Sequence, residues 1–395
     1  MDEANLLKPF NHEPRTRLIF GPGCVDRVGQ LVRQLQGRCA LVVTDAGIVA
    51  AGHARRAIRA IEQAGAAVTV FDEVHENPTT ADVQACLKVA AAAAIDTIVG
   101  LGGGSSLDTA KGCNFLLTNG GRMQDYQGRG KATSPMLPLV AVPTTAGTGS
   151  ECQSFALIAD QDTGQKMACG DPKAAARIAL LDPQLTLTQP SQVTACTGID
   201  TVAHALETAV TRPRNALSLL YSHEAFRLAH DALPQVLEKP GNLDARSRMQ
   251  LAATYAGIAI ENSMLGAAHS AANPLTARYG VVHGQAVGIM LPPVMRFNGQ
   301  DGPAAATYRQ LARRCDLCDG QADGPAALEA LVRGVESLLD RAGLRSCLFN
   351  LKIPRSAMAK LAAEAARQWT AQFNPRSVSS ADFYDLYERV YSPAP

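Results

Sequence analysis

Four residues with metal-binding side chains lie in the second half of this 395-residue chain. Asp200 and His204 are four positions apart in an apolar segment, so a helix would place both side chains on one face. His269 and His283 each lie among small residues, which leave room for a ligand beside the ring. One carboxylate and three imidazoles suit a borderline divalent ion such as Fe²⁺ or Zn²⁺. These four residues are therefore candidate metal ligands.

Ordinary structural roles compete with this interpretation when each position is taken singly. An Asp and a His one helical turn apart more often form a hydrogen-bonded pair than a metal site. A buried, unpaired carboxylate would nevertheless be costly, and a cation would remove that cost. A lone histidine is more often a satisfied core residue. We assign that ordinary role to the five other histidines: His12, His53, His75, His223 and His230.

A glycine-rich turn indicates a second kind of chemistry, anion binding. Gly102 to Ser106 lie between a predicted strand, 97–101, and a predicted helix, 106–118. Glycines let backbone N–H groups approach an anion, and the positive end of the helix dipole adds to the attraction, so a pyrophosphate would fit. The alternative is a tight strand-to-helix turn without a ligand. The turn is not a G-x-G-x-x-G fingerprint.

Two further strand ends support a dinucleotide site. A loop of small and hydroxylated residues, 143–151, follows the predicted strand 138–142. Open α/β sheets bind dinucleotides in the crevice between such loops. Asp45 ends another predicted strand, where a carboxylate can accept a hydrogen bond from a ribose 2′-hydroxyl and repel a 2′-phosphate, which favours NAD over NADP. Capping of the next helix is an equally good interpretation of Asp45.

Two styles of sequence meet near residue 185 and predict two domains. Before it, short apolar runs alternate with helical patterns, as in the βαβ units of a parallel sheet. The predicted strands are 39–44, 67–71, 97–101 and 138–142, and the predicted helices are 50–64, 80–93 and 106–118. After it the strand signals end, and the predicted helices are 197–210, 216–232 and 245–260. We expect an α/β dinucleotide-binding domain with a parallel sheet over 1–184 and an all-α metal-binding domain over 185–395, with a ligand site in the cleft between them.

Composition limits the classes of partner that we expect for this protein. Hydrophobic residues make up 47% and charged residues 18%, which suits a large buried core. The net charge is +1 and the basic residues are dispersed, so we expect no nucleic-acid partner. No uncharged apolar stretch approaches the roughly 18 residues that span a bilayer, and 1–9 lacks the apolar region of a secretory signal, so we expect no membrane association and a cytoplasmic location. The ten cysteines are scattered like reduced thiols, and we assign Cys315 and Cys318 a structural role.

The ordered set of motifs resembles the iron-containing (group III) alcohol dehydrogenases over essentially the whole chain. The motifs are Phe20-Gly-Pro-Gly23, Asn77-Pro-Thr79, Gly102-Gly-Gly-Ser-Ser-Leu-Asp-Thr-Ala-Lys111, Pro143-Thr-Thr-Ala-Gly-Thr-Gly-Ser-Glu151, Gly198-Ile-Asp-Thr-Val-Ala-His-Ala-Leu-Glu207, His269 ahead of His283-Gly284, and Asn374-Pro-Arg376. Their ordered combination is far more specific than any single motif.

The resemblance implies a dehydroquinate synthase-like architecture, NAD as cofactor, Fe²⁺ or Zn²⁺ as metal, and a homodimer. It implies that the four metal ligands are Asp200, His204, His269 and His283. It also implies that Asp45 contacts the adenosine ribose and that the pyrophosphate is bound by Gly103, Gly104 and Ser105. The remaining implied cofactor contacts are Asn77, Thr144, Thr145, Thr148 and Lys166.

Two residues depart from the pattern of these relatives. Many carry another histidine four residues after the third ligand, in the substrate cleft, where this chain has Asn273. An amide can only form hydrogen bonds there, whereas an imidazole can also relay protons. Phe155 takes a position at which some relatives have a polar residue near the nicotinamide. Both changes concern the substrate more than the reaction.

The expected reaction is reversible hydride transfer between NAD(H) and a small alcohol, aldehyde or ketone. One alternative in the same superfamily is an enzyme like glycerol dehydrogenase or dehydroquinate synthase, which generally uses fewer histidine ligands. Another alternative, from a different class, is a catalytically silent NAD-binding protein. The presence of all four ligand positions weighs against both.

Overall fold

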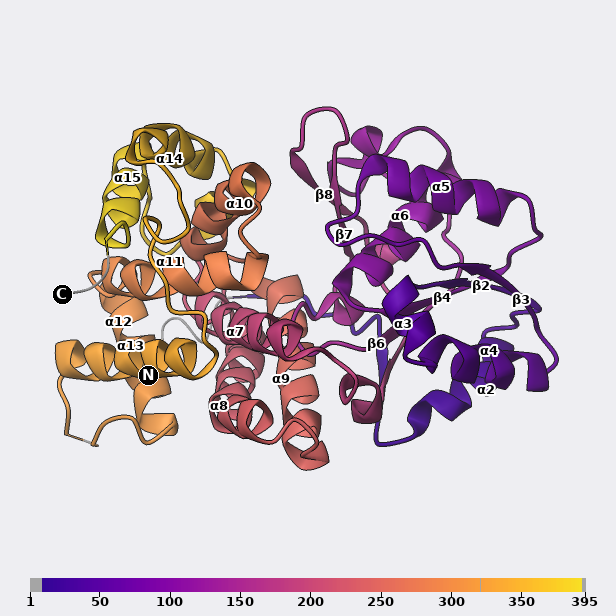
Figure 1. The fold of residues 1–395 in the computed structure, drawn as a ribbon, viewed down its shortest axis with the longest axis horizontal. Coiled ribbons are helices and arrows are strands. Elements are labelled where there is room, and N and C mark those ends of the chain that lie inside the picture. Colours follow the sequence, from indigo (N-terminus) through magenta and orange to yellow (C-terminus); the bar gives the residue numbers. More distant parts are fainter. Residues whose placement is uncertain (1–8, 320, 393–395) are drawn as a thin grey trace. The chain divides into compact units, whose positions relative to one another are not determined.

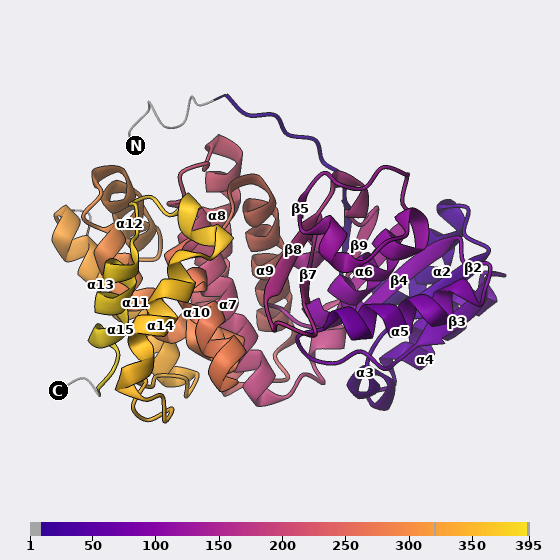
Figure 2. The ribbon, with the colours of Figure 1, turned by 90° about the horizontal axis from the view of Figure 1, so that it is seen from above.

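The computed structural model describes residues 9–319 and 321–392, which form two compact units (Figures 1 and 2). One unit is Glu13–Gln189, and the other comprises the described residues from Pro190 onward together with 9–12. We expect that 1–9 is not a secretory signal. Residues 1–8 of this segment lie outside the described part. No helix in the described part combines the length and the apolarity that crossing a membrane requires.

The first unit is built on a parallel sheet of six strands in the order β1-β9-β6-β4-β2-β3. In chain order the strands are β1 (Arg17–Phe20), β2 (Cys39–Val43), β3 (Ala67–Phe71), β4 (Thr97–Gly102), β6 (Leu139–Pro143) and β9 (Ile178–Leu181). A smaller sheet has the order β5-β8-β7, formed by β5 (Gly128–Arg129), β8 (Lys166–Gly170) and β7 (Phe155–Ala159). The predicted parallel α/β domain is therefore confirmed.

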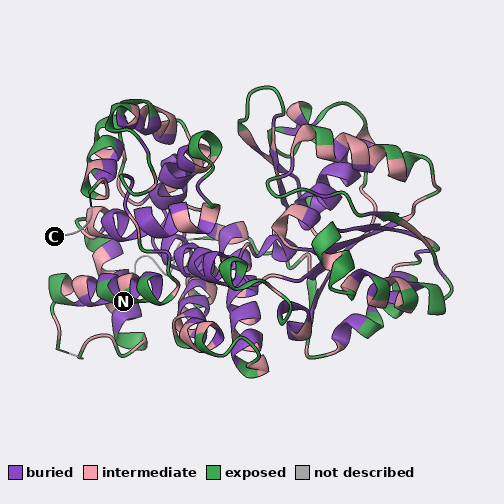
Figure 3. Cartoon of the chain, viewed as in Figure 1, coloured by how far each residue is buried: buried purple, intermediate pink, exposed green. Residues whose placement is uncertain are grey.

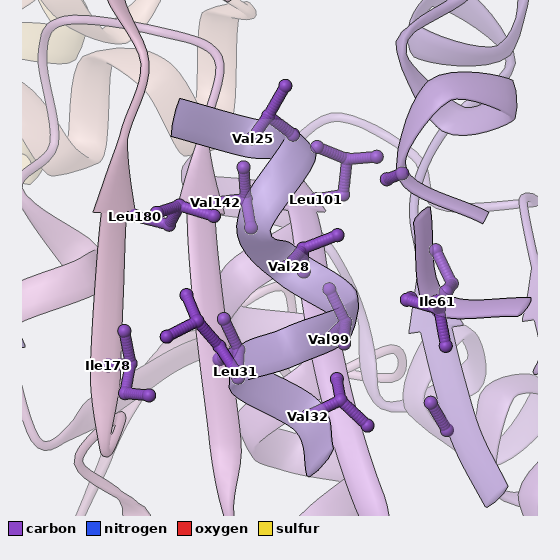
Figure 4. Close-up of a cluster of buried hydrophobic side chains, with 14 of the residues drawn as sticks. Val25, Val28, Leu31, Val32, Ile61, Val99, Leu101, Val142, Ile178 and Leu180 are labelled. Carbon is purple, nitrogen blue, oxygen red and sulfur yellow. The ribbon is translucent and has the colours of Figure 1, made fainter. Parts of the chain in front are cut away.

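Helices cover both faces of the six-stranded sheet, which explains why its strands are apolar on both sides (Figure 1). Helices α2 (Val28–Gln34) and α4 (His53–Gln63) cover one face, and α5 (Thr80–Ala91) and α6 (Gly104–Asn119) cover the other. Figure 4 shows Val28 and Leu31 of α2 among Val99, Val142 and Leu180 of the strands. The residues next to these valines and this leucine along each strand point to the opposite face of the sheet.

The sequence patterns predicted most of these elements but not all of them. The four predicted strands are present, whereas the four-residue strands β1 and β9 and the β7–β8 hairpin were not predicted. The helix predicted over 50–64 is present as α4, which begins three residues later than predicted, and a short helix before it was not predicted. Helix α3 (Ala46–Ala50) ends first, and α4 begins after Gly52, which has a φ of 82°. A left-handed residue cannot continue a helix, and glycine adopts this conformation without strain.

The second unit is helical, and its described residues contain no strand. Its helices are α7 (Ser191–Thr208), α8 (Ala216–Glu238), α9 (Leu243–Ser263), α10 (Ala267–Tyr279), α11 (His283–Asn298), α12 (Gly302–Arg314), α13 (Gly324–Arg341), α14 (Met358–Ala366) and α15 (Ser380–Arg389). Helix α7 packs against α8, α9 and α11, and most of its length is buried (Figure 3). A charged side chain on α7 therefore needs a partner close by. The predicted all-helical second half is confirmed.

Candidate active site

Helix α7 carries three ionisable side chains on one buried face. Asp200, His204 and Glu207 are spaced at i, i+4 and i+7, which brings them to the same side of an α-helix. Asp200 and His204 are each 5% exposed and Glu207 is 3% exposed. Because ionised groups are costly in an apolar interior, this face requires partners of opposite charge or a metal ion.

Three imidazoles surround one carboxylate oxygen of this face. The Nε2 atoms of His204, His269 and His283 lie 3.4, 3.3 and 3.9 Å from Oδ1 of Asp200. The rings of His204 and His269 stack with their centroids 4.8 Å apart. One ligand atom each from Asp200, His269 and His283 lies within 4.8 Å of the other two. The structure brings the four predicted ligands together. His204 belongs to this group through its contact with Asp200.

The donor atoms of this cluster fit a cation. Oδ1 of Asp200 and Nε2 of His269 are buried and have no hydrogen-bond partner within the described ranges 9–319 and 321–392. Burial alone would raise the pKa of Asp200, but the neighbouring imidazoles, His204 first, hold it well below the usual range of a carboxyl. An ionised carboxylate beside nitrogen donors is a donor set that borderline divalent metals accept. The residues present therefore fit a bound metal ion.

Glu207 holds His269 from the side opposite this cluster. Its Oε2 lies 2.5 Å from Nδ1 of His269, and its Oε1 accepts a hydrogen bond from the backbone N–H of Ala268 at 2.7 Å. Burial lowers the pKa of His269, but the carboxylates of Glu207 and Asp200 raise it to about 9. A carboxylate behind a ligand histidine fixes the ring and its tautomer, which leaves Nε2 for the metal. The sequence interpretation missed this role, although the seven-residue spacing from Asp200 was a usable signal.

The start of α10 is fixed by two side chains from distant parts of the chain. Asn374 accepts a hydrogen bond from the backbone N–H of Ala267 at 3.2 Å, next to the N–H that Glu207 binds. A Cβ on Gly266 would lie 2.9 Å from Oδ1 of Asn374 and 3.1 Å from Oε1 of Glu207. Glycine thus permits both side chains to satisfy the first N–H groups of the helix. This arrangement fixes His269, which lies in the first turn.

The start of α11 approaches α7 equally closely. A Cβ on Gly284 would lie 2.1 Å from the carbonyl oxygen of Cys196, so no larger residue fits there without movement of the backbone. His283 directly precedes this contact and is the first residue of α11. The close approach therefore explains how His283 comes within reach of Asp200.

Asn273 lies one turn after His269 in α10. Its Nδ2 donates a hydrogen bond to Oε1 of Gln368 at 3.1 Å, and both side chains are half-buried. The spacing of four residues places Asn273 on the same helix face as His269. The contact with Gln368 fixes the orientation of this amide.

The candidate cofactor residues lie where the strand order of the first unit reverses. Strand β2 lies between β3 and β4. The strand that follows β2 in the chain and the strands that follow β4 therefore extend the sheet in opposite directions. Asp45 follows β2, and Gly103 follows β4. Open α/β sheets bind ligands beyond the carboxyl ends of strands at such a reversal.

The glycine-rich turn lies against the loop that follows β6. Gly103 is the N-cap residue of α6 and provides no side-chain cap, and Gly104 and Ser105 begin the helix. A Cβ on Gly104 would lie 2.7 Å from Cγ2 of Thr148, and one on Gly103 would lie 3.3 Å from Cγ2 of Thr145. The first N–H groups of α6 are thus uncapped by side chains and adjacent to hydroxyl groups, which suits a phosphate.

A buried polar network ties this loop to α6. Lys111 is fully buried, and its Nζ donates to the backbone oxygens of Ser150 and Phe155 at 2.6 and 2.9 Å. The Ser150 hydroxyl donates to Oδ1 of Asp108 at 2.6 Å. The backbone N–H of Thr144 bonds to the end of β4. These contacts fix the predicted threonines relative to the glycine-rich turn.

Asp45 caps α3, as one of the two interpretations predicted. Its Oδ1 accepts a hydrogen bond from the backbone N–H of Ile48 at 3.0 Å. An ionised carboxylate has about four lone-pair positions, so capping does not compete with a ribose contact.

Asn77 and Lys166 are joined through the β7–β8 hairpin. Asn77 has a φ of 54°, and the carbonyl of the next residue, Pro78, accepts a hydrogen bond from the N–H of Ala159 at 2.8 Å. Ala159 is paired with Lys166 in the hairpin. Both predicted residues therefore belong to one locally connected part of the unit.

Comparisons with known proteins match both halves of the chain. Residues 14–183 match the family described as iron-containing alcohol dehydrogenase, and residues 194–391 match the C-terminal family of Fe-containing alcohol dehydrogenases. The NAD-dependent methanol dehydrogenase of Bacillus methanolicus is 31% identical over 375 residues, 94% of this chain and 97% of that protein. The 4-hydroxybutyrate dehydrogenase of Cupriavidus necator is 34% identical over 88% of this chain and 91% of that protein. A crystal structure of 1,3-propanediol oxidoreductase superposes with a TM-score of 0.92 at 29% identity, covering 96% of this chain and 98% of that one.

Proposed function

Because this chain belongs to the iron-containing alcohol dehydrogenase family, we propose that it catalyses reversible hydride transfer between NAD(H) and a small alcohol or the corresponding aldehyde or ketone. The observation that carries this proposal is the convergence of three imidazoles on the buried carboxylate of Asp200. The functional division that we propose is 1–184 for the cofactor and 185–395 for the metal and catalysis.

Asp200, His204, His269 and His283 hold the metal, Fe²⁺ or Zn²⁺, in this proposal. The buried atoms Oδ1 of Asp200 and Nε2 of His269, which lack hydrogen-bond partners within the described residues, support it. When bound, such an ion supplies positive charge that lowers the pKa of an alcohol or polarises a carbonyl. Glu207 keeps His269 in the tautomer that presents Nε2.

The α/β unit binds and orients NAD, which carries the hydride. Asp45 accepts from the adenosine ribose, and the uncapped start of α6 at Gly103, Gly104 and Ser105 binds the pyrophosphate. The other proposed cofactor contacts are Asn77, Thr144, Thr145, Thr148 and Lys166. Their support is the reversal of strand order between β2 and β4 and the contact of Gly104 with Thr148.

Asn273 orients the substrate in this proposal. Its amide can donate and accept hydrogen bonds but does not exchange a proton near neutral pH. Proton release from the alcohol therefore proceeds through water or a cofactor hydroxyl rather than through this side chain.

We also propose that the protein is a cytoplasmic homodimer. The ten free cysteines support a reducing compartment. β1 is an edge strand whose Leu18 and Phe20 are 38% and 42% exposed, and edge strands offer unpaired backbone groups to another chain. Light scattering during size-exclusion chromatography should give twice the chain mass for the wild type. The mass of a single chain would contradict the homodimer.

The test of function is NADH absorbance with methanol, 1,3-propanediol and 4-hydroxybutyrate after anaerobic loading with Fe²⁺ or Zn²⁺. Turnover should require the metal, and His269→Ala should lose both metal and turnover while NADH still binds. Unchanged turnover of the metal-stripped variant would overturn the metal assignment. NADH binding without turnover of any alcohol or aldehyde would favour a silent NAD-binding protein.

A further inference from the structure

Ser106 connects the phosphate-binding turn to the carboxylate at the end of β2. It lies in the first turn of α6 and is 1% exposed. Its hydroxyl donates a hydrogen bond to Oδ2 of Asp45 at 3.2 Å. The two residues are 61 positions apart in sequence and meet because β2 and β4 are neighbours in the sheet. The hydroxyl therefore joins two parts of the candidate cofactor site.

Gly102 leaves the space in which this contact forms. A Cβ on Gly102 would lie 2.3 Å from Oγ of Ser106 and 3.2 Å from Oδ2 of Asp45. The φ of Gly102 is 152°, a backbone conformation that favours glycine. Any side chain there would displace Ser106 from the carboxylate.

The carboxylate of Asp45 is thus held at both oxygens. Oδ1 accepts from the N–H of Ile48 and Oδ2 accepts from Ser106, which fixes the rotation of the carboxylate about its bond to Cβ. About two of its four lone-pair positions stay available. Asp45 is half-buried, so the residue is not enclosed in the interior of the unit.

We propose that Ser106 is a positioning residue for NAD. By fixing the rotation of Asp45, it directs the free lone pairs toward the adenosine ribose and so raises affinity for the adenosine end of the cofactor. This inference rests on the proposed function, in which Asp45 contacts that ribose. It also unites the two interpretations of Asp45, because the hydrogen bond that caps α3 takes part in orienting the group that binds the ribose.

The test compares Ser106→Ala with wild type in titrations of NADH fluorescence. The variant should weaken NADH binding about fivefold, which corresponds to one hydrogen bond of ordinary net strength. The kcat at saturating NAD should stay unchanged, because the nicotinamide end is not affected. With an NADH analogue that lacks the adenosine 2′-hydroxyl, wild type and variant should bind with nearly equal affinity.

Thr109→Ala is the matched control. Thr109 is also buried in α6, and its hydroxyl has no hydrogen-bond partner within the described residues. Its removal should leave NADH affinity unchanged. An unchanged NADH affinity in Ser106→Ala would overturn the inference, as would an equal loss for NADH and the 2′-deoxy analogue. Failure of the wild type to bind NADH at all would overturn the proposed function along with it.

Discussion

In the α/β unit the candidate cofactor site consists largely of glycines, hydroxyl groups and backbone N–H groups at the ends of strands. In the helical unit the candidate metal ligands are ionisable side chains on a bundle of helices, three of them buried and His283 half-buried. Gly104 touches Thr148 so closely that an added methyl group does not fit, whereas Asp200 matters for the charge that it carries. We infer that added atoms damage the candidate cofactor site, whereas loss of an ionisable group or of its charge damages the candidate metal site.

The largest effect should come from removing charge in the helical unit. Asp200→Asn keeps the shape of the side chain but removes the anion that faces three imidazoles. Metal-dependent turnover should fall at least about a thousandfold, because the metal supplies several kcal/mol of transition-state stabilisation. Metal content measured by mass spectrometry should fall with it, while the Kd for NADH stays within twofold. Asp385→Asn, at an exposed position of α15, is the control. If Asp200→Asn kept the metal content of the wild type, the inference that the candidate metal site depends on this charge would be wrong.

A smaller loss should follow from changing a residue that contacts no metal. Glu207→Gln retains an oxygen that can accept from Ala268 but neutralises the group beside His269. Metal affinity should fall about 10- to 100-fold, as for other residues that orient a ligand histidine. Competition with a chelator measures this affinity directly. Glu238→Gln at the exposed end of α8 should leave affinity unaltered. Equal affinities of the two variants would show that Glu207 does not position His269.

An added methyl group should damage the α/β unit selectively. In Gly104→Ala the new Cβ would lie 2.7 Å from Cγ2 of Thr148, so the loop or the helix start must move. The Kd for NADH should rise about tenfold, the equivalent of about 1.4 kcal/mol, with metal content preserved. Gly302→Ala, where a Cβ would meet nothing within 4 Å, is the matched control. Loss of metal from Gly104→Ala would contradict the independence of the two sites.

The smallest predicted effect concerns acid stability and comes from His223 of the helical unit. Burial, followed by the charge of Arg314, lowers the pKa of His223 to about 4. Because an unfolded histidine has a pKa near 6.5, the unfolded chain binds the proton first, and stability falls as the pH drops from about 6.5 toward 4. At pH 6 this loss is about 1 kcal/mol relative to pH 8.

Calorimetry of the metal-free protein at pH 8 and pH 6 checks this prediction. His223→Gln should lose less stability between the two pH values than wild type. The exposed His12→Gln should behave like wild type. Identical losses in wild type and His223→Gln would remove His223 as the source of the acid sensitivity.

The sequence predicted features that depend on local patterns or on ordered motifs. The two-part architecture, β3 over 67–71 and membership of the family were all predicted and are confirmed. The short helix α3 and the start of α4 directly after Gly52 were missed, although glycine is a signal for such a boundary. The contact between Asn374 and the start of α10 joins residues 107 positions apart, and no spacing rule reaches that far. Such pairings arise from tertiary packing alone.

The position of Asn374 in the chain also has a consequence for synthesis. A chain emerging from the ribosome exposes Asp200, His269 and His283 well before Asn374, which fixes the first turn of α10. Until then, Glu207 alone of the two side chains can hold that turn in place. The start of α10 therefore reaches the hydrogen bonding described above only after the chain has been extended 107 positions beyond Ala267, to Asn374.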